Sequence, residues 1–271
     1  MENLFDISGK VIVITGATGV LAGELAQYFA RCKANVVFLG RNVAKLDSAL
    51  ERAEKNNPCC CAFKCDVLDR SSLEHVRGEV LKKYGRIDAI VNGAGGNMPG
   101  ATIPDNSNFF SLDFDAWRAV VELNLGGTLL PTLVFGEVFQ AQKSGVVLNF
   151  SSMTAQSAVT RVFGYSNAKA GIDNFTKWLA VELAKKIGEG VRVNAIAPGF
   201  FISEQNRALL TNPDGSPTQR GAKVMAKTPF GRFGKAEEIF GAAHFLISDA
   251  SKFITGIVLP IDGGFSCFSG V

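Results

Sequence analysis

Tyr165 and Lys169 lie four residues apart in the segment Phe163–Gly171, which makes them the first candidates for chemistry in this sequence. Side chains at positions i and i+4 of a helix share one face and become neighbours. A free phenol has a pKa of about 10 and is a poor acid–base catalyst near neutral pH, but a nearby ammonium favours the phenolate. The pair therefore predicts a phenol that gives a proton to a carbonyl oxygen, or takes one from an alcohol.

Ser152 adds a third polar group, thirteen residues before Tyr165. It follows a predicted strand, and its hydroxyl could hold the substrate oxygen while the proton moves. A Tyr and a Lys at this spacing also occur on many solvated helix faces. The elements that would position the three side chains therefore decide between the two interpretations.

Apolar strand-like runs alternate with helical periodicity along the chain. The runs are nearly continuous, which is typical of strands covered on both faces. The predicted strands are Val11–Thr15, Asn35–Leu39, Cys60–Lys64, Ile87–Asn92, Gly145–Phe150, Val191–Ile196 and Ile257–Pro260. The predicted helices are Leu21–Cys32, Val43–Lys55, Ser71–Tyr84, Phe114–Lys143, Gly164–Lys186 and Ala236–Ile247. This alternation predicts one α/β domain, with a doubly wound, mostly parallel sheet and helices on both faces.

Two long segments, Gly93–Asp113 and Pro198–Thr228, do not fit simple crossover connections. Both follow predicted strand ends, where open α/β sheets bind their ligands, so we expect them to recognise a substrate. Pro131 lies inside the pattern Phe114–Lys143 and should kink or interrupt that helix.

Thr15–Gly23 is a turn rich in small residues between the first predicted strand and the first predicted helix. Small residues let the backbone approach a pyrophosphate, and the helix N-terminus supplies N–H donors and a positive dipole. The turn predicts a dinucleotide site, with a purely structural turn as the alternative.

Gly40 and Arg41 end the second predicted strand, where NAD-specific enzymes often carry an acidic residue for the ribose 2′-hydroxyl. A guanidinium suits a 2′-phosphate instead, which favours NADP(H) as cofactor. Two alternatives stay open: the cofactor is NAD(H), or Arg41 is a solvated surface residue that binds no cofactor. Asp66 and Val67, after the third strand, could meet the adenine, and the bend Asn92–Gly96 could lie against the dinucleotide.

The whole set resembles the short-chain dehydrogenase/reductase family, in the same order and over nearly the whole chain. The matching residues are Gly16–Gly23, Asn92–Gly95, Asn124, Ser152, Tyr165, Lys169, Pro198 and Gly199. The resemblance implies a single-domain, Rossmann-like sheet of seven strands over residues 1–271. Its cofactor half would span about 1–150, and its catalytic and substrate half about 151–271.

The resemblance also implies roles for the catalytic set. Tyr165 would be the acid/base, and Lys169 would lower its pKa and bind the nicotinamide ribose. Ser152 would orient the reacting oxygen, and Asn124 would support a water that links Lys169 to solvent. The cofactor set would be Gly16, Thr18, Gly19, Val20, Leu21, Arg41, Asp66, Val67, Asn92, Ala94, Gly95, Tyr165, Lys169, Pro198, Gly199, Phe201 and Ser203.

Val20 and Ala22 depart from this pattern, because they occupy the second and third glycine positions of the family turn. Ala22 is tolerable for helix–strand packing, whereas Val20 implies a slightly different path near the phosphates, partly compensated by Gly19.

Several loops resemble the D-mannonate oxidoreductase (fructuronate reductase) branch of the family, which interconverts D-fructuronate and D-mannonate. These are Ala94–Thr102, Phe109–Asp113, Gly127–Thr132, Ala197–Leu210 and Asp262–Val271, and Val20-Leu21 also resembles this branch. The candidate substrate residues are Asn97, Ser152, Thr154, Arg161, Tyr165, Gln205, Asn206 and Arg207. The side-chain amides among them could hydrogen-bond several hydroxyls of a sugar acid, and Arg161 or Arg207 could bind its carboxylate with two parallel hydrogen bonds. Surface ion pairs and solvated amides are the alternatives.

Two rival functions stay open. One is a reductase for another keto-sugar acid, polyol or polar ketone. The other is a non-catalytic dinucleotide-binding protein, which would have no need of a proton donor such as Tyr165.

The bulk composition limits the possible partners. The chain has 271 residues, 47% apolar and 20% charged, with a net charge of +3, which argues against nucleic acid or an acidic membrane surface. We expect no signal peptide and no membrane-spanning stretch, and hence a cytoplasmic location. Cys59, Cys60, Cys61 and Cys65 are consecutive or near neighbours on a predicted strand, so we expect no metal there. The family resemblance implies a homotetramer.

Overall fold

Seven parallel strands form one sheet in the computed structural model, which describes residues 3–204 and 206–270. Their order across the sheet is β3-β2-β1-β4-β5-β6-β7. The strands are β1 Val11–Thr15, β2 Asn35–Gly40, β3 Cys61–Lys64, β4 Ala89–Asn92, β5 Gly145–Phe150, β6 Val191–Pro198 and β7 Val258–Ile261. The order reverses between β1 and β4, and such a switch point opens a crevice at the carboxyl edge of the sheet.

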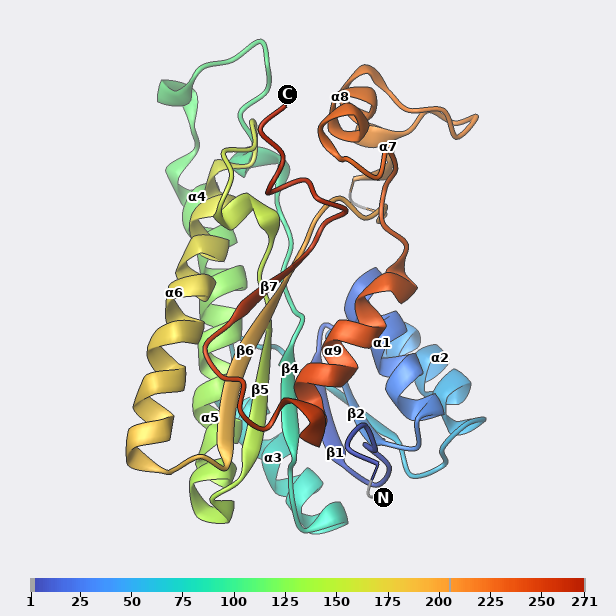
Figure 1. Cartoon of the computed structure of the whole chain (residues 1–271), viewed down its shortest axis with the longest axis vertical. Helices are drawn as coiled ribbons and strands as arrows, with labels where there is room; N and C mark the ends of the chain where they lie inside the picture. The colour runs from blue at the N-terminus through green and yellow to red at the C-terminus, as the bar shows by residue number, and fades with distance from the viewer. Residues whose placement is uncertain (1–2, 205, 271) are drawn as a thin grey trace.

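Helices cover both faces of this sheet (Figure 1). The α-helices are α1 Val20–Arg31, α2 Val43–Glu54, α3 Arg70–Tyr84, α4 Phe114–Val121, α5 Gly127–Gln142, α6 Phe163–Lys186, α7 Arg207–Leu210, α8 Gln219–Lys227 and α9 Phe240–Ile247. The described residues also form a π-helical turn, Glu122–Gly126, and five short 3₁₀ turns: Pro99–Ala101, Phe109–Ser111, Met153–Ala155, Ala236–Ile239 and Asp249–Ser251. The layer of α1, α2 and α9 lies on one face, and α3 to α6 lie on the other.

This architecture confirms the predicted single-domain, doubly wound sheet. The boundaries differ by one or two residues, as with β6, which continues to Pro198. The predicted helix Ala236–Ile247 begins as a 3₁₀ turn and becomes α-helical only at Phe240.

Pro131 was predicted to kink or interrupt its helix, and the predicted interruption was wrong. The helical stretch is interrupted earlier, by a π-helical turn over Glu122–Gly126, and α5 runs on through Pro131. Pro131 lies only one turn into α5, where the residue it faces, Gly127, is the first of the helix. There the missing N–H and the ring disturb few hydrogen bonds.

The stretch Phe114–Gln142 is long and apolar enough to cross a membrane by length and composition alone. We had expected no such stretch. Val134, Phe135 and Phe139 on it are fully buried against the sheet. Part of its apolar composition therefore builds the core of the domain, whereas Phe114 and Leu133 on the same stretch are exposed.

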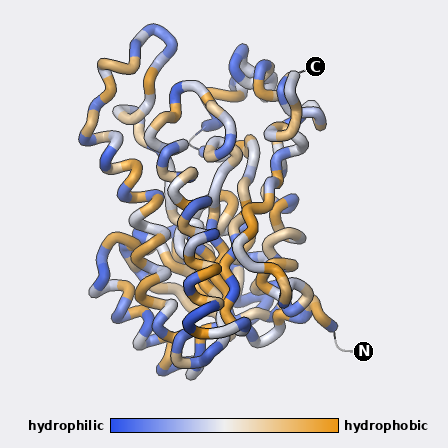
Figure 2. The backbone as a smooth tube through the Cα atoms, turned by 60° about the vertical axis from the view of Figure 1, so that its left-hand side comes forward, coloured by the Kyte–Doolittle hydropathy of each residue, from blue (hydrophilic) through white to orange (hydrophobic). Residues whose placement is uncertain are grey.

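Two apolar clusters fill the space between sheet and helices, one on each face. Hydrophobic stretches run through the middle of the molecule in Figure 2. Polar side chains also cross this interior near the carboxyl ends of β4 and β5. Asn92 donates to Thr132 Oγ1 (2.8 Å) and Asn149 Oδ1 (2.9 Å), and Asn149 donates to Thr176 Oγ1 (2.9 Å). These bonds tie two strands to α5 and α6 directly below the crevice.

The two long segments predicted from the sequence rise above this edge of the sheet (Figure 1). Residues 93–113 carry two 3₁₀ turns, and residues 198–228 carry α7 and α8. The sheet thus supplies a rigid base, and the loops form the walls around it.

Gly145 gives a test of how tightly the core is packed. A Cβ at this position would overlap the buried Phe139 ring. We expect Gly145→Ala to lower the free energy of unfolding by about 1–3 kcal/mol in urea titrations, as overpacking does. Phe139→Leu in the same chain should recover part of the loss. Gly78→Ala, at an open position of α3, should be neutral or stabilising by up to about 1 kcal/mol. Equal effects of the two Gly→Ala changes would contradict this account.

Candidate active site

A cleft of about 1480 Å³ runs along the carboxyl edge of the sheet. It begins at the Gly-rich turn after β1 and reaches the first turns of α6, where Tyr165 and Lys169 lie. Ser152, at the end of β5, lines the same cleft. The structure therefore brings together the three side chains that the sequence singled out, in one space that also includes the dinucleotide turn.

Tyr165 lies three residues into α6, beside Ser152. Burial raises the pKa of Tyr165, and a hydrogen bond with Ser152 opposes that rise. Ser152 Oγ also accepts from the backbone N–H of Thr154 (3.2 Å), which fixes the hydroxyl. The pKa of Tyr165 is thus raised, contrary to the prediction that Lys169 would lower it, so the phenol is kept protonated. The Ser152 hydroxyl beside it can share a substrate oxygen.

Lys169 carries a buried ammonium, since only 4% of the residue is exposed. Its Nζ donates to the carbonyl oxygen of Phe150 (2.7 Å) and lies 5.3 Å from the centre of the Tyr165 ring. Burial lowers the pKa of Lys169 to about 8, and the charge of Asp173 opposes this. The ammonium therefore loses its proton not far above neutral pH, and it lies over the ring of Tyr165.

Asp173 is one helical turn beyond Lys169 and mostly buried. Burial raises its pKa, whereas hydrogen bonds from Ser151 and Gln156 lower it. Ser151 donates directly to Asp173 Oδ1. Asp173 was not among the predicted site residues, although it stands at the same four-residue spacing from Lys169 as Lys169 does from Tyr165. Its charge raises the pKa of Lys169 and so favours the ammonium.

Asn124 lies in the π turn, fully buried, and faces the bend after β4. Its Oδ1 accepts from the Gly96 N–H (3.2 Å), and its Nδ2 donates to the carbonyl oxygens of Gly96 (2.7 Å) and Val120 (2.8 Å). A Cβ on Gly95 would meet Asn124 Oδ1 at 2.5 Å and Lys169 Nζ at 3.7 Å. The π turn therefore places the Asn124 amide beside the ammonium, and the bend must be glycine to admit it.

The dinucleotide end of the cleft is made of backbone and small side chains. Gly16 has φ +66°, and a Cβ there would meet Gly93 O at 2.7 Å. Thr15 Oγ1 accepts from the N–H groups of Gly93 and Ala94 (both 3.1 Å), which ties the first turn to the bend after β4. Helix α1 begins immediately afterwards with free backbone N–H groups, as an anion site requires.

Arg41 lines the cleft beside the end of β2. A side chain at Gly40 would contact Thr18 at 3.3 Å and Leu46 at 3.4 Å. Gly40 stands where many NAD enzymes carry a carboxylate, so this position has no charge here, and the guanidinium of Arg41 follows it.

Most of the predicted cofactor residues line the cleft, but some do not. Those that do are Gly16, Thr18, Gly19, Val20, Leu21, Arg41, Gly95, Tyr165, Lys169, Pro198, Gly199, Phe201 and Ser203. Asp66, Val67, Asn92 and Ala94 lie outside its lining. Asp66 accepts from the N–H of Leu68 in its own turn (3.0 Å), and Asn92 is buried below the cleft.

The predicted substrate residues divide in the same way. Asn97, Thr154, Arg161 and Asn206 line the cleft, whereas Arg207 is exposed and does not. Asn206 uses its amide to accept from Ser203 N–H (2.7 Å) and to donate to Phe201 O (2.8 Å), so it shapes the loop. Gln205 lies outside the described residues.

Arg220 is a charged lining residue that sequence reasoning missed. It lies on α8 and donates to Thr160, in the connection between β5 and α6. A charged residue inside a long segment has no fixed spacing to any motif, so only the fold reveals that it meets the site.

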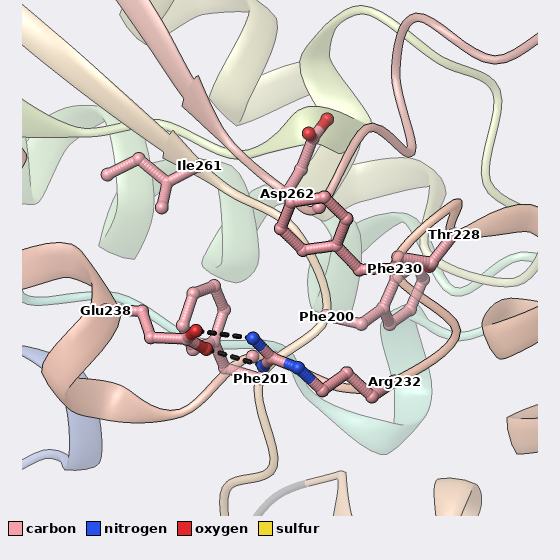
Figure 3. A pocket seen from close by; sticks show the side chains of 10 residues that line it. Phe200, Phe201, Thr228, Phe230, Arg232, Glu238, Ile261 and Asp262 are labelled. Atoms are coloured by element: carbon pink, nitrogen blue, oxygen red, sulfur yellow. Dashed lines mark hydrogen bonds and ion pairs between the residues drawn. The ribbon is translucent and has the colours of Figure 1, made fainter.

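A smaller cavity of about 230 Å³ lies behind the loop that follows β6 (Figure 3). Phe200 and Phe201 line both this cavity and the main cleft. In the smaller one, Arg232 and Glu238 face each other in a two-bonded ion pair (2.7 and 2.6 Å). This pair braces the segment behind Phe201 and so supports the wall of the main cleft.

Metal ligation finds no support in residues 3–204 and 206–270, where no group of three His, Cys, Asp or Glu side chains could hold an ion. In the same ranges the cysteines are free thiols, and burial raises the pKa of Cys60, Cys61 and Cys65.

A family model described as enoyl-(acyl carrier protein) reductase matches residues 16–266. The chain belongs to the short-chain dehydrogenase/reductase family. It is 42% identical to an uncharacterized oxidoreductase of Haemophilus influenzae, over 98% of this chain and 96% of that one. It is also 33% identical to the 3-oxoacyl-[acyl-carrier-protein] reductase FabG of Thermotoga maritima, over 95% of this chain and 98% of the other.

A solved Haemophilus structure with bound NAD is also similar, at 41% identity and a TM-score of 0.90, over 99% of this chain and all of that one. It is described as a candidate D-mannonate oxidoreductase. Together with the family match, these relatives make this chain an NAD(P)-dependent oxidoreductase. The predicted family and enzyme class are thereby confirmed.

The lowered pKa of Lys169 predicts the pH dependence of reduction. Its ammonium is present below about pH 8 and is lost as the pH rises through that value. We expect kcat/KM for the reduced cofactor to fall above about pH 8, because this ratio reports the free enzyme. Asp173→Asn should move the fall to lower pH, since the Asp173 charge raises the lysine pKa.

Asp115→Asn on the exposed surface of α4 is the matched control and should leave the profile unchanged. An Asp173→Asn profile that coincides with wild type would show that the Lys169 ammonium does not set this limb.

Proposed function

We propose that this enzyme interconverts D-fructuronate and D-mannonate, with Tyr165 as the acid/base. The observation that carries the proposal is the single cleft in which the dinucleotide turn and the Ser152–Tyr165–Lys169 set meet the side chains of Arg161 and Arg220. The similarity to the Haemophilus structure, with its description and bound NAD, supports the same substrate class. A saturated hydrocarbon substrate would leave these polar groups without partners.

The chain's own residues would divide the work of reduction as follows. When bound, the reduced nicotinamide supplies the hydride. Ser152 holds the ketone oxygen, and Tyr165 delivers its phenolic proton to that oxygen as the alcohol forms. Lys169 stabilises the resulting phenolate. The Asn124 amide beside Lys169 would support the water that returns a proton to the site.

For the cofactor we propose a preference for NADP(H), with NAD(H) as the alternative. Gly40 offers no carboxylate to repel a 2′-phosphate, and the exposed Arg41 lies within the cleft to pair with it. The NAD in the Haemophilus structure favours the alternative.

We further propose a cytoplasmic homotetramer that takes a small sugar acid and neither nucleic acid nor membrane as partner. Large apolar side chains remain exposed on the outer helices, namely Phe114, Leu133, Trp178 and Val181. Burying them against a second copy would remove apolar surface from water.

A second candidate function is reduction of another keto-sugar acid, polyol or polar ketone at the same site. A non-catalytic dinucleotide-binding role is the third, and turnover with any carbonyl substrate excludes it. The direct test is loss of reduced-nicotinamide absorbance when D-fructuronate is added, compared with a panel of other ketones.

Tyr165→Phe removes the proton donor while keeping the ring. We expect turnover to fall about 100- to 10,000-fold, as loss of a general acid does, with the dissociation constant of the cofactor nearly unchanged. Steady-state rates and cofactor titration measure the two effects separately. Turnover near the wild-type level would refute the assignment of Tyr165.

Arg41→Gln tests the cofactor preference. If Arg41 binds the 2′-phosphate, KM for NADPH should rise roughly ten-fold, as loss of one exposed charge-assisted contact does, while KM for NADH stays constant. The measurement is a comparison of NADPH and NADH with D-fructuronate. A wild-type enzyme that prefers NADH, with Arg41→Gln affecting both cofactors equally, would contradict the preference.

A further inference from the structure

Arg161 and Arg220 place two guanidinium groups in the wall of the catalytic cleft. Arg161 lies between β5 and α6, and Arg220 lies on α8, yet both line the space that contains Ser152 and Tyr165. Burial lowers the pKa of Arg220, and the positive charge of Arg161 lowers it further, because two neighbouring cations repel each other. Two cations in one wall attract an anion between them.

The surrounding loops hold both arginines in place. Arg220 donates from Nη1 to Thr160 Oγ1 (3.1 Å) and from Nη2 to the Thr160 carbonyl oxygen (3.0 Å). Arg161 has φ +79°, a backbone conformation that L residues rarely adopt. The N–H of Ile103 donates to the Arg161 carbonyl oxygen (3.0 Å) and secures it. Strained residues of this kind cluster at ligand sites.

Three buried polar atoms in this wall have no hydrogen-bond partner: Arg161 Nε, Thr154 Oγ1 and Asn97 Oδ1. They come from two separate segments, Asn97 from the one after β4 and the other two from the one between β5 and α6, and all three residues line the cleft. The other end of the Asn97 amide is occupied, because Nδ2 donates to Thr102 Oγ1 (3.2 Å). Buried polar atoms without partners are costly, so this set indicates a ligand that supplies them.

Asp105 is a carboxylate near these two arginines, but it pairs with them too weakly to replace an anionic ligand. It approaches Arg161 Nη1 at 3.9 Å, but 82% of its side chain is exposed, against 24% for Arg161. Solvent screens such a carboxylate, and one carboxylate cannot neutralise two guanidinium groups. The wall keeps a net positive charge.

We propose that Arg161 and Arg220 together bind the carboxylate of the substrate, and that Asn97 and Thr154 bind its neighbouring hydroxyls. This deepens the proposed function and rests on it for the reaction, but not for the binding of the anion. In D-fructuronate a run of hydroxyl-bearing carbons separates the ketone from the carboxylate. Thr154, hydrogen-bonded to Ser152, lies where that run would start. The exposed Arg207 has no part in this clamp.

D-fructose provides a matched neutral substrate, because it differs from D-fructuronate only in carrying CH₂OH in place of the carboxylate. We expect Arg161→Gln and Arg220→Gln each to raise KM for D-fructuronate about ten- to hundred-fold, and to change kcat/KM for D-fructose less than about two-fold. Arg220→Lys, which keeps the charge without the planar fork, should recover part of the affinity. Arg118→Gln, on the exposed face of α4, should change neither substrate.

Equal losses for both substrates would overturn the proposal, as would unchanged KM values in both variants. A strong effect of Arg207→Gln on D-fructuronate alone would place the clamp on that side of the loop and would equally overturn it. Preference for D-fructose 6-phosphate over D-fructuronate would show that the site takes a phosphate and would refute the carboxylate assignment. Thermal unfolding of each variant checks that it is folded.

A binding experiment separates this proposal from the proposed reaction. The wild-type enzyme with its oxidised cofactor is titrated calorimetrically with D-mannonate, and with D-mannitol as the neutral counterpart. Affinity for D-mannonate that falls at least ten-fold in both arginine variants supports the clamp even if D-fructuronate is not turned over. Wild-type affinity for D-mannonate in the variants refutes it, even in an enzyme that reduces D-fructuronate.

Discussion

The burial of the Lys169 ammonium is the constraint on which the rest of the site depends. A buried charge is costly unless neighbouring groups compensate for it. Here the carbonyl oxygen of Phe150 accepts from Nζ, and the charge of Asp173 opposes the loss of the proton. Both partners are held by the fold, one by the end of β5 and the other by the next turn of α6. Any shift between that strand and that helix would take the Phe150 carbonyl oxygen away from the ammonium.

The helix on the other side of the cleft is irregular at Asn124, within the π turn Glu122–Gly126. A regular α-helix through residues 114–142 would give Asn124 a different direction, because the π turn adds a residue to one turn. With the π turn, the Asn124 amide bonds both backbone groups of Gly96 and approaches the bend after β4. The glycine at position 95 is then needed for close approach to Asn124 as much as for a dinucleotide.

Periodicity along the sequence predicted the sheet and its helices because strands covered on both faces must be apolar throughout. The four-residue spacing of Tyr165 and Lys169 predicted their common face for an equally local reason. The interruption predicted at Pro131 was wrong, because the helix is interrupted by a π turn over Glu122–Gly126 that no local rule on proline predicts. Arg220 could not be predicted, since its place in the site depends on how a long segment folds back over β5 and β6. Arg207 belongs to that segment too, yet it faces solvent.

The two ends of the cleft differ in what lines them: backbone groups and small residues at the cofactor end, and long charged side chains at the substrate end. The cofactor end is made of backbone N–H groups and small residues such as Gly16. Few substitutions are possible there, because a side chain added at Gly16 would collide with the bend after β4. At the other end, the long side chains of Arg161, from the connection between β5 and α6, and of Arg220, from α8, reach into the cleft and are held by hydrogen bonds of the surrounding segments. Exchanging such side chains alters the charge presented to a substrate without disturbing β5, α6 or the ammonium between them. The chemistry can thus stay constant within the fold while the loops decide which ketone reaches Tyr165.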